Sequence, residues 1–193
     1  MAFYFSRFPL VDYDIEKDNT FIQIQNPLVR FKILDILKGK RFLYLDYIIE
    51  EDESASEIAF NYYADETLDW VIYIVNDIID PKYDWPLSYN RFNSYIINKY
   101  GSVENAIKET TTENIHHYEW IIQAQTTLFD GSILPEKVVI VDETKYDTLT
   151  ASERRIVRNY EYEDKLNNDK RRIKMLKPNY LIQFLAEVRS VLA

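Results

Sequence analysis

Two adjacent histidines, His116 and His117, are the only histidines of this 193-residue chain. Neutral imidazole is a good metal ligand, and histidine is the usual general base at neutral pH. The segment around them, residues 115–126, predicts a strand, on which neighbouring side chains point to opposite faces. Two such histidines cannot easily share one metal ion. We therefore expect ordinary strand histidines and no metal site.

The richest run of carboxylates is EEDESASE, residues 50–57. Paired carboxyl groups are common in acid–base catalysis. This run is instead typical of a solvated turn leading into a helix cap, because Ser54 and Glu57 have the Ser-x-x-Glu spacing of a capping box. The chain has neither a glycine-rich phosphate loop nor a serine in a nucleophile elbow. We therefore expect no catalytic residues, no cofactor and no enzymatic activity.

Cysteine is absent and tyrosine is abundant, with 16 residues. The absence of cysteine excludes disulfides, thiolate metal sites and a cysteine nucleophile, and it fits a reducing cytosol or a large assembly. Tyrosine combines a large apolar ring with a polar tip and is enriched at protein interfaces. Sugar-binding sites use the same side chain, so the tyrosine content alone leaves both kinds of partner open.

The charge of the chain is unevenly divided. Its net charge is −9, but residues 151–193 hold 10 Lys and Arg against 6 Asp and Glu, and the remainder holds 13 against 26. The acidic body argues against nucleic acid as a partner, and the basic tail suits docking between protein subunits. A merely solvated surface accounts for the charge equally well. We expect no signal peptide and no membrane span.

Residues 1–40 predict an extended arm followed by a helix. Residues 1–26 contain many aromatic side chains without a clear period, so we expect an irregular arm that needs a surface to bury against. Residues 26–37 predict a helix with Asn26 as its N-cap and Gly39 after its end.

Residues 41–87 predict one strand and two helices. The strand, over 41–50, is expected to place Leu43, Leu45, Tyr47 and Ile49 on one face. The capping box opens the first helix, and Asn76 ends the second. Each helix has one apolar face, formed by Ala55, Ile58, Ala59 and Tyr62 in the first and by Leu68, Val71, Ile72 and Val75 in the second.

Residues 88–193 predict a mixture of helices and strands. Helices are expected over 88–101 and 102–110, strands over 115–126 and 137–143, and a hairpin turn at Asp130–Gly131.

Three further elements are expected near the C-terminal end. Thr150 and Glu153 have capping-box spacing, which predicts a charged helix to about residue 168. Residues 171–177 predict a short strand. A last helix follows Pro178, with an apolar stripe of Leu181, Phe184, Leu185, Val188 and Leu192. The predicted fold class is α+β.

The order strand, capped helix, acidic turn, helix, Asn and Pro in residues 47–81 resembles a LysM module. The matching residues are Tyr47, Ile49, Glu53, Ser54, Ile58, Ala59, Tyr62, Tyr63, Asp65, Ile72, Tyr73, Asn76 and Pro81. The resemblance implies two helices packed on a small sheet, and LysM modules bind N-acetylglucosamine chains. This chain has Asp52 in place of a usual glycine and KYDWPLSYNRF in place of the usual closing strand. Its acidic residues would also repel an anionic cell wall.

A second resemblance covers nearly the whole chain. DWVIYIVNDIIDPKYDWPLS, residues 69–88, resembles the central signature of the small baseplate wedge protein of contractile-tailed, T-even-like phages, the gene 53 product type. YEYEDKLNNDKRRIKMLK, residues 160–177, resembles the C-terminal element of that family.

The second resemblance implies a structural subunit of the tail baseplate of the virion, made in the host cytoplasm. Such a subunit would contact other wedge subunits and join six neighbouring wedges around a central hub, without membrane or nucleic acid. The alternative is a LysM-type protein that binds peptidoglycan or chitin.

Nine residues are the candidates for partner binding. Trp70 and Tyr73 lie about 100° or more off the apolar face of their helix, which favours a second contact surface. The others come from the family signature and from the basic tail: Asn76, Asp77, Tyr83, Trp85, Arg171, Arg172 and Lys174.

Two segments near the C-terminus have alternative interpretations. Residues 158–172 predict either an exposed helix with paired charges or a docking face for an acidic neighbour. The stripe of the last helix either completes its own domain or, with the arginines before it, faces a partner. We favour the partner. The sequence divides into an arm and helix at 1–40, a LysM-like module at 41–87 and an α+β region at 88–193.

Overall fold

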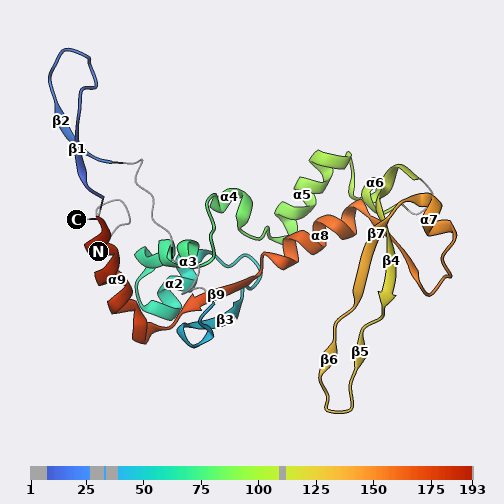
Figure 1. Cartoon of the computed structure of the whole chain (residues 1–193). Coiled ribbons are helices and arrows are strands. Elements are labelled where there is room, and N and C mark those ends of the chain that lie inside the picture. Colours follow the sequence, from blue (N-terminus) through green and yellow to red (C-terminus); the bar gives the residue numbers. More distant parts are fainter. Residues whose placement is uncertain (1–7, 27–32, 34–38, 109–111, 193) are drawn as a thin grey trace. The chain divides into compact units, whose positions relative to one another are not determined.

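The computed structural model describes residues 8–26, 33, 39–108 and 112–192. The fold is a mixture of helices and small antiparallel sheets, which confirms the predicted α+β class. The chain forms two compact units (Figure 1). The first unit is built from the two end segments of the sequence. Unit 1 consists of Met1–Pro86 and Lys170–Ala193, and unit 2 consists of Leu87–Asp169.

The N-terminal arm of unit 1 is a hairpin over its described residues. β1 (Leu10–Tyr13) pairs antiparallel with β2 (Ile22–Gln25). The expectation of an irregular arm is therefore wrong for these eight residues. The helix predicted over 26–37 lies outside the described residues, except for the capping Asn26 and for Ile33, which is buried.

The centre of unit 1 is a two-stranded antiparallel sheet. β3 (Tyr44–Ile48) pairs with β9 (Arg172–Leu176), although the two strands are far apart in the sequence. The predicted strand is shorter than expected, because Arg41–Leu43 form a 3-10 turn. Ile49 is buried and Tyr47 packs against the core, but Leu45 is 47% exposed, so the predicted apolar face is only partly buried.

Two helices pack on this sheet. α2 (Ala55–Tyr63) begins at the predicted capping box, in which Ser54 N donates to Glu57 Oε2 at 2.8 Å and Glu57 N donates to Ser54 Oγ at 3.2 Å. After a 3-10 turn at Glu66–Leu68, α3 (Asp69–Val75) ends at Asn76, as predicted. The apolar faces predicted for the two helices are confirmed, and their most buried members are Ile58, Ala59, Val71 and Ile72.

The last helix completes the core of unit 1. α4 (Pro81–Asp84) is a single turn, and α9 (Pro178–Leu192) is the predicted C-terminal helix. From its stripe, Leu181, Phe184, Leu185 and Val188 pack against the core of the unit. Val188 is buried and the other three are partly buried, so the stripe completes its own unit, which is the alternative that the prediction did not favour.

Unit 2 combines helices with a three-stranded sheet. Its helices are α5 (Tyr89–Tyr100), α6 (Val103–Ile107), α7 (Glu143–Asp147) and α8 (Asn159–Asp169). A three-stranded antiparallel sheet has the order β7 (Lys137–Val141), β4 (Ile115–Gln123), β8 (Arg154–Arg158). A small core of Phe92, Ile96 and Ala106 lies among the helices.

A hairpin arm joins β4 to β7. β5 (Thr126–Thr127) and β6 (Ile133–Leu134) form two residue pairs, and the predicted turn is present, with Gly131 at a φ of 80°. In Figure 1, the hairpin of β5 and β6 extends from the ends of β4 and β7, away from the three-stranded sheet.

The helix predicted after Thr150 begins later than expected. Thr150 Oγ1 does donate to Glu153 Oε2 at 2.7 Å, but the residues that follow form β8, and α8 begins only at Asn159. The pairing of Arg154–Arg158 with β4 overrides the local cap, because a tertiary ladder outweighs a single capping interaction. The capping box thus closes a turn before a strand.

Candidate interaction surfaces

Trp70 belongs to the core of unit 1. Its side chain is 4% exposed, and its ring stacks on that of Phe184 from α9, with centroids 6.0 Å apart. The prediction that Trp70 lies outside the buried face is therefore wrong. The apolar face of α3 is wider than its sequence period indicated, because α9 adds a second apolar layer.

Tyr73 and Trp85 lie together and are both half-buried. Their rings meet edge to face at 5.8 Å, and Trp85 Nε1 donates to the carbonyl oxygen of Glu53 at 3.0 Å. Burial, followed by the charge of Asp69, raises the pKa of Tyr73. The pair fastens the segment after α4 to the acidic turn before α2. Each side chain is thus committed in part to contacts within unit 1.

Asn76 joins α3 to the sheet. Its Nδ2 donates to Ile72 O at 2.8 Å and to Lys174 O at 2.9 Å, and its Oδ1 accepts from Lys174 N at 2.8 Å. The side chain therefore occupies the outer edge of β9 as a neighbouring strand would. The next residue, Asp77, is exposed and has a φ of 56°. The position predicted for partner binding thus has an internal structural role at Asn76.

The three predicted cationic residues differ in their surroundings. Arg171 is half-buried, and its guanidinium donates to Glu50 O at 3.2 Å and to Glu51 Oε2 at 2.7 Å, so it clamps the turn after β3. Arg172 and Lys174 are exposed on one face of β9, where they pair across the sheet with Ile48 and Asp46.

Tyr83 is the most accessible aromatic residue among the nine candidates. Its side chain is 66% exposed, and its carbonyl oxygen accepts from Lys170 Nζ at 2.6 Å. Of the candidates, the structure therefore leaves Asp77, Tyr83, Arg172 and Lys174 exposed, and it brings together Tyr73 with Trp85 and Asn76 with Lys174.

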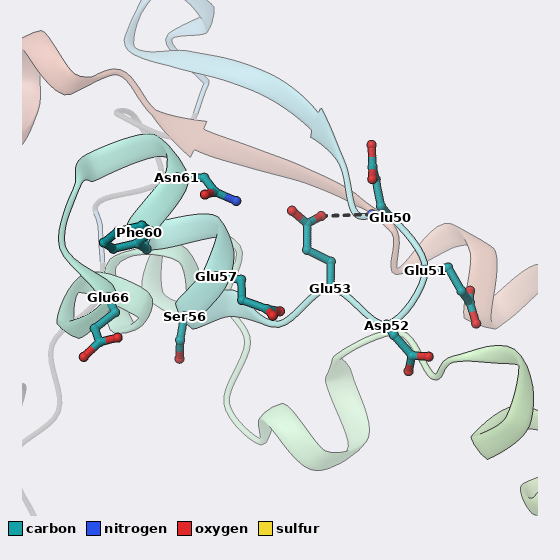
Figure 2. A pocket seen from close by; sticks show the side chains of 9 residues that line it. All are labelled: Glu50, Glu51, Asp52, Glu53, Ser56, Glu57, Phe60, Asn61 and Glu66. Atoms are coloured by element: carbon teal, nitrogen blue, oxygen red, sulfur yellow. Dashed lines mark hydrogen bonds between the residues drawn. The ribbon is translucent and has the colours of Figure 1, made fainter.

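An acidic groove of about 730 Å³ lies between the turn after β3 and α2 (Figure 2). We call it the acidic groove. Its lining residues are Glu50, Glu51, Asp52, Glu53, Ser56, Glu57, Phe60, Asn61 and Glu66. The sequence predicts a solvated turn for most of these residues, because a run of acids does not reveal that the chain will fold around it.

The carboxylates of the acidic groove have different roles. Glu53 accepts from Tyr47 OH at 2.7 Å and from Glu50 N at 3.0 Å, the second of which is the dashed line in Figure 2. Glu57 is held by the capping box and Glu51 by Arg171. Glu50, Asp52 and Glu66 are exposed, and Phe60 is 60% exposed beside them. Such a surface suits lysine or arginine side chains and disfavours anionic glycans.

Tyr47 provides a test of this part of the structure. Burial, followed by the hydrogen bond to Glu53, raises its pKa to about 12 from an ordinary 10.0. A raised pKa means that the stabilisation is complete below pH 10 and is lost as the pH rises through about 12. The absorbance titration of the wild type minus that of Tyr47→Phe should show one late-titrating tyrosine. A difference curve centred near 10.0 would contradict the contact.

Glu163 is a buried carboxylate that joins α8 to α5 in unit 2. It is 7% exposed and accepts from Lys99 Nζ at 2.5 Å, Tyr100 OH at 2.9 Å and Tyr95 OH at 3.1 Å. Burial alone would raise its pKa, but the hydrogen bonds from Lys99 and Tyr100 outweigh burial and lower it. The stretch 158–172 is therefore not a wholly exposed helix, since Asn167 is buried as well.

We expect Glu163→Gln to destabilise unit 2 by about 2 kcal/mol, because a neutral amide accepts the three hydrogen bonds less well. Amide hydrogen exchange in α8 measures this, with exposed Glu113→Gln as the charge-matched control. Because the pKa of Glu163 is lowered, its stabilisation is complete above the ordinary value of 4.5 and is lost as the pH falls below it. Equal exchange in the two variants at pH 7 would contradict the prediction.

The rings of the two histidines contact each other, contrary to prediction. A register shift between Ile115 and His117 brings the two Nδ1 atoms within 2.7 Å of each other, and His116 stacks on Tyr162 at 3.6 Å. Adjacent side chains diverge on a regular strand, but an irregular register removes that alternation. Across the described part of the chain, no three histidine, aspartate or glutamate side chains gather as a metal site would require.

His116 should titrate below the ordinary value of 6.5. Burial, followed by the charge of His117, lowers its pKa, so its contribution to stability is present above pH 6.5 and is lost as the pH falls. The chain has two histidines, so their ring signals in an NMR titration are easily assigned. Tyr162→Ala should move the pKa of His116 towards 6.5. An unchanged titration in that variant would contradict the effect that we attribute to the contact between His116 and Tyr162.

Many exposed apolar residues of unit 2 lie in the hairpin arm, on β7 and at the adjoining end of β4. They include Ile122, Leu128, Phe129, Ile133, Leu134, Val139 and Ile140. The run KVVIV was visible in the sequence as a strand, but its exposure depends on its place at the edge of the sheet. None of the helices that the structure describes has both the length and the apolar character needed to cross a membrane.

The chain is similar to a known protein family along nearly its whole length. No curated protein matches the chain. The family model described as base plate wedge protein 53 matches residues 5–189, which is nearly the whole chain. This match includes both units and the central signature around Asn76. The chain therefore belongs to the base plate wedge protein 53 family, structural proteins of the phage tail baseplate.

Proposed function

We propose that this subunit connects neighbouring wedges of the baseplate, so that six wedges close into a ring around the hub. The observation that carries the proposal is the division of one chain into two compact units, each with a core of its own. A connector needs two separate binding surfaces, and closed rings form through such head-to-tail contacts. Assembly in the host cytoplasm belongs to the same proposal.

Each unit offers a different kind of surface. Unit 1 presents the acidic groove and a hairpin with exposed Leu10, Tyr13 and Ile22. Unit 2 presents the apolar hairpin arm. Charged groups guide the approach of two proteins, and buried apolar and aromatic groups supply most of the affinity. A subunit with one surface of each kind is suited to bind two different neighbours.

Baseplate assembly in the absence of the protein tests the proposal. Phage lacking this chain should accumulate single wedges and no closed baseplates, as measured by sedimentation and electron microscopy. Adding the purified chain to those wedges should restore closed rings. Closed baseplates formed without the chain would contradict a connecting role, and failure to form even single wedges would place its role earlier in assembly.

Glycan binding is the second candidate. The order β3, α2, α3, β9, with two helices on a two-stranded sheet, favours the LysM resemblance, which stays a prediction. The carboxylates of the acidic groove oppose an anionic ligand such as peptidoglycan. Retention of the chain on purified peptidoglycan and on neutral chitin separates the two possibilities. Saturable retention on either polymer would favour the LysM function.

A further inference from the structure

The free edge of β7 is the feature of unit 2 that its own fold does not use. In the three-stranded sheet, β4 pairs with one side of β7, and no other described strand pairs with its second side. An exposed edge of this kind is a template for another strand, so proteins usually protect it with charges, prolines or bulges. β7 reads KVVIV and has its single charge at Lys137, the first residue.

The opposite edge of the same sheet is protected. β8 reads RRIVR, and its residues are all half-buried. Arg155 of β8 donates to buried Glu119 of β4 at 2.7 Å and to Glu136 at 2.8 Å. One edge strand therefore carries three arginines, and the other is aliphatic apart from its first residue.

Each face of β7 presents an exposed aliphatic side chain at this edge. Val139 pairs across the sheet with Trp120, on the face where Lys145 of α7 lies 5.0 Å from the Trp120 ring, and Val139 is 42% exposed. Ile140 pairs with Glu119, so it lies on the opposite face, and it is 67% exposed. A strand added beside β7 would cover both side chains. Such a strand needs a run of consecutive apolar residues, since its alternate side chains must serve both faces.

The hairpin arm extends this surface. It has a ladder of only two residue pairs, and a two-stranded hairpin without a core is marginally stable in water. Four apolar side chains of the arm are exposed: Leu128, Phe129, Ile133 and Leu134. The pair of Arg155 with Glu136 fixes the base of the arm. The base of the arm is therefore fixed, while the apolar side chains of the arm stay exposed. A bound strand would cover these side chains.

We propose that the free edge of β7 binds an extended, apolar segment of another baseplate wedge protein as an added fourth strand. Backbone hydrogen bonds would supply the affinity, and Val139 and Ile140 the specificity. The inference rests on membership of the wedge family and goes beyond the connecting role, because it assigns a binding mode to one surface.

A different protein suits this edge better than a second copy of the chain does. Unit 2 holds 9 Lys and Arg against 14 Asp and Glu, so two copies brought edge to edge would repel each other. An antiparallel contact between two β7 strands would also be a closed two-fold contact. Such a contact links copies in pairs and cannot continue around the six-membered ring that we propose.

The full-length chain with Val139→Lys and Ile140→Lys tests the proposal. Charges at an edge strand oppose strand addition while leaving the pairing of β7 with β4 in place. Ile97→Lys, at a 48% exposed position of α5 in the same unit, is the matched control. Phage lacking the gene are supplied with each variant, and the amount of the chain that co-purifies with wedges and baseplates is measured. Circular dichroism melts of the free variants verify that both are folded.

We expect the β7 variant to be depleted from wedges and baseplates by on the order of tenfold or more, in line with loss of a central interface contact, and the control to be incorporated normally. In wild-type baseplates, amides of residues 137–141 should exchange more slowly than in the free chain. Normal incorporation of the folded β7 variant, or unchanged exchange on assembly, would overturn the proposal.

If the β7 variant fails to fold, the hydrogen-exchange measurement on wild-type baseplates decides whether the proposal holds. If the free wild-type chain sediments as a dimer that the β7 substitutions dissociate, a second copy occupies the edge and the proposed partner is wrong. The connecting role is judged separately, by the closure of wedges without the chain. Closed baseplates in that experiment would remove the connecting role and leave the exchange result for β7 standing.

Discussion

Trp70→Ala is expected to lower the free energy of unfolding of unit 1 by about 3–5 kcal/mol, as is usual when a buried tryptophan is truncated. The side chain is 4% exposed and stacks on Phe184, so alanine would leave a cavity between α3 and α9. A loss of this size is a large fraction of the stability of most domains. Amide hydrogen exchange in α2 measures it for unit 1 alone, which matters because a chain of two units need not unfold in one step.

Tyr83→Ala is the matched control for Trp70. Tyr83 belongs to the same signature and is 66% exposed, so its truncation should change stability by less than about 0.5 kcal/mol. The two variants also separate a core role from a partner role. If Trp70→Ala folded with normal stability but failed to enter baseplates, Trp70 would bind a partner and the core assignment would be wrong.

Asn76→Asp should destabilise unit 1 by about 2–4 kcal/mol, although the two side chains have the same shape. The carboxylate still accepts from Lys174 N, but it cannot donate to the carbonyl oxygens of Ile72 and Lys174, which lie 2.8 and 2.9 Å from Nδ2. It would place a negative charge against two carbonyl oxygens. Urea denaturation followed by hydrogen exchange in α3 gives the change in unfolding free energy.

The pH dependence of this variant provides a second check. Below pH ~4 the new aspartate protonates and regains one donor, so the penalty should shrink as the pH falls. Asn61→Asp makes the same chemical change at an exposed position of α2 and should have little effect. Equal stability of the two variants at pH 7 would show that the amide of Asn76 does not hold α3 to β9.

Local signals predicted the helices of unit 1 well. Ser54 and Glu57 marked the start of α2, and the period of Leu68, Val71, Ile72 and Val75 identified the buried face of α3. Each of these signals spans only a few residues, so the neighbouring sequence contains all that is needed to read it. The hairpin turn at Gly131 was readable for the same reason.

The features that the sequence did not predict depend on distant contacts. The burial of Trp70 comes from Phe184, more than a hundred residues later in the chain. β8 replaced the expected helix start because β4 offered a ladder, and the irregular register of β4 moved His116 beside His117. The acidic groove and the free edge of β7 are also products of packing. Their residues were visible as runs of acids and of aliphatic residues, but exposure is a property of the fold.

The pairing of β3 with β9 sets an order of events during synthesis. Unit 2 is continuous in sequence, so it can fold on the ribosome as soon as it emerges, whereas the sheet of unit 1 needs residues 172–176. A nascent chain that stops before β9 therefore has a complete unit 2 and an open unit 1, without the partner strand of β3 or the stripe of α9. Such a fragment lacks the buried core residues Ile173, Met175, Leu176 and Val188. A chain that terminates before residue 172 therefore cannot complete the sheet of unit 1.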